Sequence, residues 1–275
     1  MFRLMEPADL PAMEQLWAAQ QGGPAELAEK AILRFAGAEN AYVAPAADGL
    51  RAMVLAVPVT LQGRPGCYLC GLSAREDAWA DGAAAGLLDY ACEEQARRGA
   101  AFLAAAPAGA QQAAFYADRG FARAFPLRCL TKEVRRNLWS QAEFDAVTAK
   151  KLCELRRRYC PDAVELDPGR MAVVLGDLYA RGVTIVSGPH GYGLYFRREE
   201  TLYFIELMAD DDRSAEVLME AARQKEVVVE KAVITVGAEQ PLFYGEGTRQ
   251  DYGMIRFAGP PFDVSGCYMR LMLDS

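Results

Sequence analysis

The sequence contains almost no histidine: among 275 residues there is one, His190. A metal site built from several histidines is therefore excluded, and any Ser/His/Asp or Cys/His mechanism would depend on that single residue. His190 lies in the glycine-rich stretch SGPHGYG, which favours a turn residue over a catalytic base. Long apolar runs are also missing, and the N-terminus MFRLMEPADLPAME lacks a basic region followed by an apolar core. We therefore expect a soluble, cytoplasmic protein with no membrane partner.

Basic charge is scarce as well. Lys and Arg number 30 against 37 Asp and Glu, so the net charge is −7. Nonspecific binding of nucleic acid or anionic lipid requires a basic face, and we expect neither as a partner. Hydrophobic residues make up 52% of the chain and charged residues 24%, which is typical of a globular protein with a substantial core. Wholesale disorder is excluded.

The seven cysteines do not form a recognisable metal or disulfide pattern. Cys67 and Cys70 make a CxxC, but the surrounding GCYLCGLSA predicts a strand, on which positions three apart face opposite sides. No second CxxC completes a zinc site. An odd number of cysteines in a chain of this length favours reduced, buried thiols, and we expect no metal.

Strand and helix patterns alternate in the first half. Apolar residues at helical spacing, with Asp9 near the N-cap and Pro11 in the first turn, predict a helix over residues 6–20. The same approach gives further helices at 25–36, 81–98 and 110–120. Strands are predicted at 2–5, 40–46, 50–61, 66–74, 101–107 and 121–134.

The second half repeats this alternation. Ser140 and Glu143 have the spacing of a capping box and predict a helix over 140–158, after a linker at 136–140. Further helices are predicted at 167–182 and 212–225, and strands at 184–189, in a hairpin over 191–208, at 231–238 and at 268–274. Because strand, helix, strand recurs in both halves, we expect an α/β protein with mixed sheets in two similar domains, residues 1–137 and 138–275.

The segment from GCYLCGLSA through REDAWADGAAAGLL to FYADRGF resembles the N-acetyltransferases of the GNAT superfamily. In that family a strand end, a glycine turn that opens a long helix, and an FYxxxGF segment hold acetyl-coenzyme A. The resemblance implies that Leu72, Ser73 and Ala74 offer backbone groups to the pantetheine. It also implies that the pyrophosphate lies on a turn formed by Trp79, Ala80, Asp81, Gly82, Ala83 and Ala84.

Backbone N–H groups at a helix N-terminus, with the helix dipole behind them, are suited to bind a pyrophosphate, and Gly82 allows its close approach. The family places Arg or Gln where this chain has Trp79, and a basic residue where it has Asp81. The alternative interpretation is structural: Asp81 complements the helix dipole, Trp79 packs on a neighbour, and Ala83 and Ala84 let helix and sheet approach closely.

Tyr116 of FYADRGF is the candidate catalytic residue, because the family uses a tyrosine there to assist the departing thiolate. With a phenol pKa near 10 and a thiol pKa near 8.5, hydrogen bonding to the thiolate is easier than full proton transfer. The alternative is an aromatic residue packed on the sheet beside Phe115. No general base is identifiable from the sequence.

In the second half, Asp210, Asp211 and Asp212 stand where a phosphate-binding turn would lie, so we expect no coenzyme there. DYGMIRF and YMRLMLD resemble the end of two-domain GNAT proteins, whose second copy is degenerate. The resemblance thus implies acetyl transfer from acetyl-CoA to an unidentified small-molecule or peptide amine. Alternatives are a catalytically inactive GNAT-fold binding or regulatory protein and, against the acidic balance, aminoacyl transfer from a charged RNA. The sequence does not indicate an oligomeric state.

Overall fold

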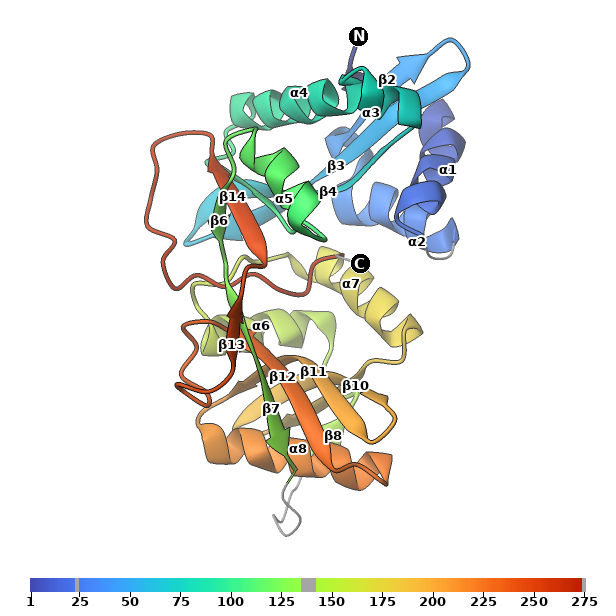
Figure 1. Cartoon of the computed structure of the whole chain (residues 1–275). Helices are drawn as coiled ribbons and strands as arrows, with labels where there is room; N and C mark the ends of the chain where they lie inside the picture. The colour runs from blue at the N-terminus through green and yellow to red at the C-terminus, as the bar shows by residue number, and fades with distance from the viewer. Residues whose placement is uncertain (23–24, 135–141, 274–275) are drawn as a thin grey trace.

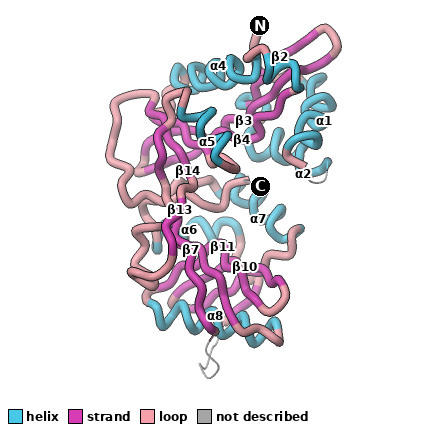
Figure 2. The backbone as a smooth tube through the Cα atoms, viewed as in Figure 1, coloured by secondary structure: helices cyan, strands magenta, loops and turns pink. Residues whose placement is uncertain are grey.

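The computed structural model describes residues 1–22, 25–134 and 142–273 and contains two seven-stranded mixed sheets (Figures 1 and 2). The first sheet has the order β1-β2-β3-β4-β5-β14-β6. Its strands are β1 Arg3–Leu4, β2 Ala41–Ala46, β3 Gly49–Leu61, β4 Arg64–Ala74, β5 Phe102–Ala105, β6 Ala122–Ala124 and β14 Gly253–Phe257. Its helices are η1 Pro7–Asp9, α1 Leu10–Gln20, α2 Ala25–Lys30, η2 Ala31–Ala36, η3 Ala38–Asn40, α3 Glu76–Ala80, α4 Ala83–Arg97 and α5 Ala110–Ala117.

The second sheet has the order β13-β7-β12-β11-β10-β9-β8. Its strands are β7 Leu127–Glu133, β8 Glu143–Phe144, β9 Thr184–Gly188, β10 Gly191–Arg198, β11 Thr201–Ala209, β12 Lys231–Gly237 and β13 Thr248–Gln250. Its helices are α6 Ala149–Tyr159, α7 Pro168–Ala180 and α8 Asp212–Glu226. Helices α4 and α8 cover the two outer faces, whereas α6, α7 and the C-terminal segment lie between the sheets (Figure 1).

The two sheets exchange strands. β7 precedes the second half in sequence but pairs with β12, and β14 comes from the C-terminal region but pairs with β5 in the first sheet. Neither sheet is therefore built from one continuous half of the sequence. The predicted linker at 136–140 and the domain boundary predicted at residue 137 fall in the segment outside the described residues.

The recurrence of strand, helix and strand is present in three dimensions. β4 and β5 are parallel neighbours joined through α4, and β11 and β12 are parallel neighbours joined through α8. In each pair the parallel register covers four residues, ending at Leu69↔Ala105 and at Phe204↔Ile234. In each pair the earlier strand then continues for five residues without its parallel partner. The structure therefore contains two copies of the strand–helix–strand unit whose recurrence the sequence predicts.

One hydrophobic core joins the halves. It combines side chains from α1 and η2, such as Trp17 and Phe35, with Leu175 of α7 and Met269 of the C-terminal segment. Two satellite cores fill the space beneath α4 and beneath α8. A hydrogen bond also joins the two halves: Arg170 Nε on α7 donates to the Phe35 carbonyl of η2 at 2.9 Å. The halves are thus packed as one body.

Three predicted elements differ from the structure. The strand expected over 121–134 is divided into β6 and β7 by a left-handed residue, Phe125, at φ +52°, and each part enters a different sheet. The helix expected over 140–158 begins only at Ala149, where Thr148 Oγ1 accepts from Lys151 N–H at 3.3 Å. Ser140 lies outside the described residues. The C-terminal strand expected at 268–274 is instead an extended segment with a single bridge, Ala163↔Tyr268.

The cysteines follow the expectation of free thiols. Cys67 belongs to the core beneath α4 and Cys70 to the core between the halves, so the CxxC pair faces opposite sides of β4. Within residues 1–22, 25–134 and 142–273, no group of three or more His, Cys, Asp or Glu side chains is arranged to hold a metal. In the same ranges, no helix has the length and hydrophobicity that a bilayer crossing requires.

Candidate active site

The candidate site begins where β4 separates from β5. Beyond the last parallel pair, Leu69↔Ala105, strand β4 runs on as Cys70–Ala74 beside β3, while β5 ends and the chain turns toward α5. One edge of β4 therefore carries backbone N–H and C=O groups that no strand of this sheet can take up. Such an edge is a binding site for another extended chain or for a ligand containing amides.

A β-bulge shapes this end of β4. Opposite the single residue Val54 of β3 lie two residues of β4, Gly71 and Leu72. Gly71 has φ +59°, and a Cβ at this position would lie 2.6 Å from the ring of Trp17 on α1. Only glycine combines the left-handed conformation with this close approach. The bulge changes the direction in which β4 continues at Leu72. In the sequence LCGLSA, the single residue Gly71 makes this change possible.

Two glutamines at the end of α1 occupy the unpaired edge. The N–H of Arg75 donates to Arg51 C=O of β3 at 2.8 Å, so the backbone groups of the preceding residue, Ala74, point away from β3. There the side-chain amide of Gln20 donates to Ala74 C=O and accepts from Ala74 N–H at 3.1 Å. Gln21 Nε2 lies 3.4 Å from Leu72 C=O and 3.4 Å from Ser73 Oγ.

The turn before α4 has the conformation expected of an anion-binding helix start. Gly82 is left-handed (φ +81°, ψ 7°), with open space where a Cβ would be. The first backbone bond of α4 runs from Gly86 N–H to Gly82 C=O at 2.9 Å, so the N–H groups of Ala84 and Ala85 precede it. Ala84 is buried against the sheet, as close packing of helix and sheet requires.

The carboxylate of Asp81 already caps one backbone N–H group at the start of α4. Its Oδ1 accepts from Ala83 N–H at 3.0 Å, and its other oxygen is paired with Arg51 of β3. Arg51 also donates to Asp77 at 3.0 Å. Hydrogen bonding from Arg51 lowers the pKa of Asp81 below its usual value, so this carboxylate is charged at neutral pH. Arg51 thus offsets the negative charge that Asp81 and Asp77 bring to the turn.

A cavity of about 570 Å³ lies beside these elements. Leu72 at the β4 bulge, Trp79 of α3, Gly109 before α5 and Phe115 of α5 are among the residues that line it. The rings of Trp79 and Phe115 meet edge to face, with 5.6 Å between centroids. The volume is within the range of small-molecule and cofactor sites. Among the residues singled out from the sequence, the structure brings Leu72 and Trp79 to this cavity.

Tyr116 lies behind the cavity wall. Its side chain is only 5% exposed, and its ring packs edge to face on Phe115 at 5.7 Å and on Phe121 at 5.2 Å. Burial, with the Cys70 and Cys92 thiols nearby, raises the pKa of Tyr116 well above its ordinary value. The phenol is therefore neutral over the whole working range of pH and can act as a hydrogen-bond donor.

The corresponding helix start in the second half is filled by carboxylates. Asp211 Oδ1 accepts from Ser214 N–H at 2.7 Å, and Asp212 Oδ1 accepts from Phe243 N–H at 2.7 Å. Asp210 Oδ2 lies 2.9 Å from Nδ1 of His190, which is an exposed turn residue. Because carboxylates cap this helix start, it does not offer the same backbone site to a phosphate.

Several neighbours of the site were not identified from the sequence. Gln20, Gln21 and Arg51 are distant from the strand–turn–helix motif in sequence, and only the packing of α1 and β3 beside β4 brings them there. Polar side chains at a helix C-terminus are common, so no local pattern marks the glutamines. The rotation of α5 about its axis decides that Phe115, and not Tyr116, lines the cavity. The FYADRGF pattern does not define this rotation.

No protein-family model and no curated protein sequence matches this chain. Solved structures do match its fold. A probable N-acyltransferase from Enterococcus faecalis superposes with a TM-score of 0.73 at 15% identity, over 94% of this chain and 72% of that chain. A GCN5-related N-acetyltransferase from Kribbella flavida gives 0.70 at 14% identity, over 94% and 72%.

A tandem GNAT protein from the clavulanic acid biosynthesis pathway gives a TM-score of 0.54 at 14% identity and covers 95% of this chain and 99% of its own. The chain therefore has the two-domain fold of the GNAT N-acetyltransferases, as the motif series in its first half predicts.

Proposed function

We propose that this protein is an N-acetyltransferase that moves the acetyl group of acetyl-coenzyme A to an amine on a small molecule or peptide. The observation that carries the proposal is the cavity at the separated ends of β4 and β5, which is lined by Leu72 of β4 and by Trp79 of α3, the helix that precedes the left-handed Gly82 and α4. In this proposal the backbone edge of β4 pairs with amides of the coenzyme, the start of α4 binds its pyrophosphate, and the cavity of about 570 Å³ holds the reacting groups. The fold shared with N-acetyltransferases supports the same conclusion.

The residues fit the coenzyme in part. The edge of β4 at Leu72–Ala74 offers amide partners for the pantetheine once the side chains of Gln20 and Gln21 yield them. The N–H groups of Ala84 and Ala85 point out of the start of α4, where the helix dipole favours negative charge. Arg51 keeps the neighbouring Asp81 and Asp77 paired, which reduces their repulsion of a pyrophosphate.

The reaction is a direct transfer. The neutral amine nitrogen attacks the thioester carbonyl carbon, a C–N bond forms, and the carbonyl oxygen becomes negatively charged. When the tetrahedral intermediate collapses, the C–S bond breaks and its electron pair leaves on sulfur. The nitrogen loses one proton to a base or to water, and the thiolate gains one. Tyr116 is buried against Phe115 and does not line the cavity, so in this proposal its O–H stabilises the leaving thiolate after the Phe115 side chain moves aside.

The test is isothermal titration of the full chain with acetyl-coenzyme A, beside the variant Gly82→Glu. A side chain at this left-handed position carries backbone strain, and its carboxylate lies where the pyrophosphate is proposed to bind. Gly259→Ala, at a glycine without positive φ and with open space around it, is the matched control. We expect micromolar binding by the wild type and the control, and at least a tenfold loss in Gly82→Glu.

Two results would contradict the proposal. Equal binding by Gly82→Glu and wild type would move the coenzyme away from the α4 start. No binding by a folded wild-type protein would favour the alternative, a GNAT-fold binding or regulatory protein. Only a positive titration would justify a screen of amines, in which acetyl transfer is detected by release of the coenzyme thiol.

A further inference from the structure

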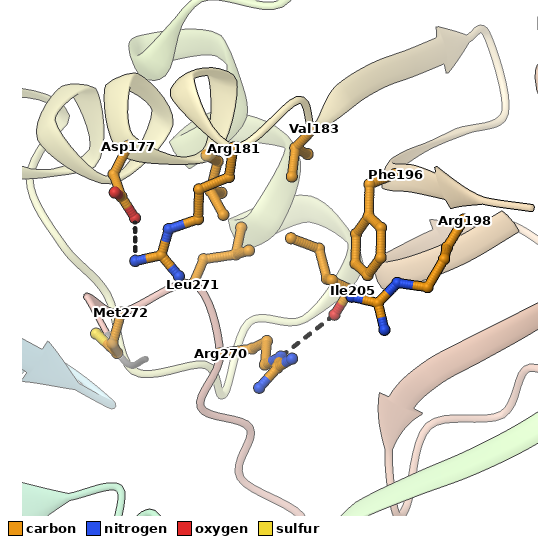
Figure 3. A pocket seen from close by; sticks show the side chains of 10 residues that line it. Asp177, Arg181, Val183, Phe196, Arg198, Ile205, Arg270, Leu271 and Met272 are labelled. Atoms are coloured by element: carbon orange, nitrogen blue, oxygen red, sulfur yellow. Dashed lines mark hydrogen bonds and ion pairs between the residues drawn. The ribbon is translucent and has the colours of Figure 1, made fainter. Parts of the chain in front are cut away.

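The cavity of about 570 Å³ in the candidate active site has an uncharged lining. Six of its eight described lining residues are Leu, Trp, Phe, Ala or Gly, and the other two are Gln111 and Gln112. The cavity of about 400 Å³ in the second half is different, because four charged side chains line it, among them Arg181, which pairs with Asp177 at 2.8 Å (Figure 3). A charged group that enters an uncharged lining loses its hydration without gaining a partner. The cavity of the candidate active site therefore favours an apolar group.

Trp79 brings an exposed aromatic ring to this cavity. The residue is 39% exposed, and its ring meets that of Phe115 at 76°. The sequence neighbours of Trp79 hold its helix in place, because Asp77 and Asp81 both pair with Arg51 of β3. The indole is thus positioned at the cavity before any ligand arrives. An apolar group that covers it gains contact at a low cost in ordering.

The cavity lies at the thioester end of the proposed coenzyme site. In the proposed function the pantetheine pairs with the β4 edge at Leu72–Ala74, and the pyrophosphate binds at the start of α4. The chain passes from Ala74 through α3 to α4, so the pyrophosphate belongs to the Ala74 end of this edge and the thioester to the Leu72 end. Leu72 is also the residue of this edge that lines the cavity. An acyl group on the coenzyme sulfur would therefore extend into the cavity.

An acetyl group is small for this space. One water molecule takes about 30 Å³ of the liquid, so the three heavy atoms of an acetyl group take on the order of 100 Å³. The cavity of about 570 Å³ is several times larger. Lining atoms that face an empty space lose their dispersion contacts, whereas a longer chain would supply them. The volume and the apolar lining thus favour the same ligand.

The amine acceptor has a different space available. A cavity of about 240 Å³ shares Gly109 and Ala110 with the larger cavity, so the two are direct neighbours. Its lining includes Arg123 and Asp251, which form an ion pair. A polar amine suits this charged lining better than the uncharged one, which leaves the larger cavity to the acyl chain.

We propose that the acyl donor of this protein carries an aliphatic chain longer than acetyl, and that this chain occupies the larger cavity against Leu72 and Trp79. The inference rests on the proposed function and changes only the size of the transferred group. The amine nitrogen still forms the C–N bond, the C–S bond still breaks, and the electron pair still leaves on sulfur. Acetyl-coenzyme A is then the smallest donor of a series, and Trp79 determines the preference for chain length.

The test is isothermal titration of the full chain with acetyl-, butyryl- and hexanoyl-coenzyme A, without an acceptor. The three ligands share every part except the chain, so a difference in Kd reports on the chain alone. Transfer of one methylene from water to an apolar site corresponds to about fourfold in affinity. We expect hexanoyl-coenzyme A to bind at least tenfold more tightly than acetyl-coenzyme A, with butyryl-coenzyme A between them.

Two variants change the cavity in opposite ways. Trp79→Ala removes part of the lining, and Ala108→Phe fills the space with a larger side chain. Tyr179→Ala is the control for the first, because this ring on α7 is 41% exposed and belongs to the other half. Ala114→Phe is the control for the second, at an exposed residue of α5 that is not among the lining residues.

The quantity compared is the ratio of the Kd for acetyl-coenzyme A to the Kd for hexanoyl-coenzyme A. We expect this ratio to fall below threefold in Trp79→Ala and in Ala108→Phe, and to keep its wild-type value in both controls. A wild-type ratio near one, or a ratio that neither cavity variant changes, overturns the proposal.

Failure of this inference is distinguishable from failure of the proposed function. A protein that binds all three ligands equally well, and loses that binding in Gly82→Glu, retains the proposed function but has no subsite for a longer chain. A folded wild-type protein that binds none of the three overturns the proposed function, and the assignment of the acyl chain with it.

Discussion

The side-chain amide of Gln20 pairs with both backbone groups of Ala74, accepting from its N–H at 3.1 Å and donating to its C=O. An amide on α1 thereby takes the place that a neighbouring strand would occupy at the end of β4. The pantetheine arm of coenzyme A also contains amides, and in the proposed function it pairs with this same edge. The two cannot use Ala74 at the same time, so the coenzyme must displace Gln20.

The variant Gln20→Ala is therefore expected to bind acetyl-coenzyme A more tightly. A hydrogen bond of this kind contributes about 0.5–1.5 kcal/mol net, so removing the competing side chain corresponds to roughly a two- to twelvefold lower Kd. Isothermal titration measures it, with the exposed Gln15→Ala on the same helix as control. Weaker binding in Gln20→Ala would instead show that Gln20 orders the strand end for the ligand.

The second prediction concerns the β-bulge at Gly71. In Gly71→Ala, the new Cβ would lie 2.6 Å from the Trp17 ring, at a backbone φ of +59°. Strain and overpacking at such a site typically cost about 1–3 kcal/mol of unfolding free energy. We expect that loss in urea unfolding, together with weaker acetyl-coenzyme A binding because Leu72 moves. Gly259→Ala is the control for an unstrained glycine. Unchanged stability and binding in Gly71→Ala would remove the bulge from the proposed site.

The sequence predicts the elements of this fold better than their assembly. Local signals were sufficient for the parallel unit of β4, α4 and β5, because alternating apolar residues, Gly82 and the helical spacing of Leu87 and Leu88 all lie within one segment. The strand exchange was not predictable locally, since β7 and β14 read as ordinary strands that either sheet could take. Phe125, whose left-handed backbone sends β7 into the second sheet, gives no such signal in its residue type.

The same limit applies to the site. The motif resemblance named the turn from Trp79 to Ala84, and in the structure Gly82 of this turn is left-handed and directly precedes α4. It did not indicate that Asp81 would be paired with Arg51, or that α1 would supply Gln20, because both contacts join residues at least 30 positions apart. Long-range side-chain contacts depend on the packing of elements, and a single sequence carries little record of them.

Tyr116→Phe tests the proposed role of the phenol. Burial keeps the pKa of Tyr116 well above its ordinary value, so loss of its proton does not limit the wild-type rate up to about pH 10, the usual phenol pKa. Because the ring packs between Phe115 and Phe121, we expect phenylalanine to preserve stability while turnover falls at least tenfold. The pH–rate profile and acetyl-coenzyme A affinity are measured alongside. Unchanged turnover would remove Tyr116 from the mechanism.

The last prediction concerns a buried charge network around Glu206. Arg156 of α6 and Glu206 of β11 are 4% and 0% exposed, and Arg156 Nη2 lies 3.4 Å from Glu206 Oε2. Tyr192 and Tyr268 donate to the same carboxylate at 2.7 Å and 3.0 Å, so Tyr268 ties the C-terminal segment to the second sheet. Burial raises the pKa of both tyrosines, which keeps them as neutral donors at neutral pH.

Glu206→Gln removes the charge of this carboxylate while nearly preserving its shape, and the guanidinium of Arg156 is then buried without a counter-charge. Breaking a buried pair in this way costs about 3–5 kcal/mol, which we expect as a lower unfolding free energy in urea. Glu200→Gln, at an exposed carboxylate in the β10–β11 turn, is the control. A loss of stability below about 1 kcal/mol would show that water reaches Arg156.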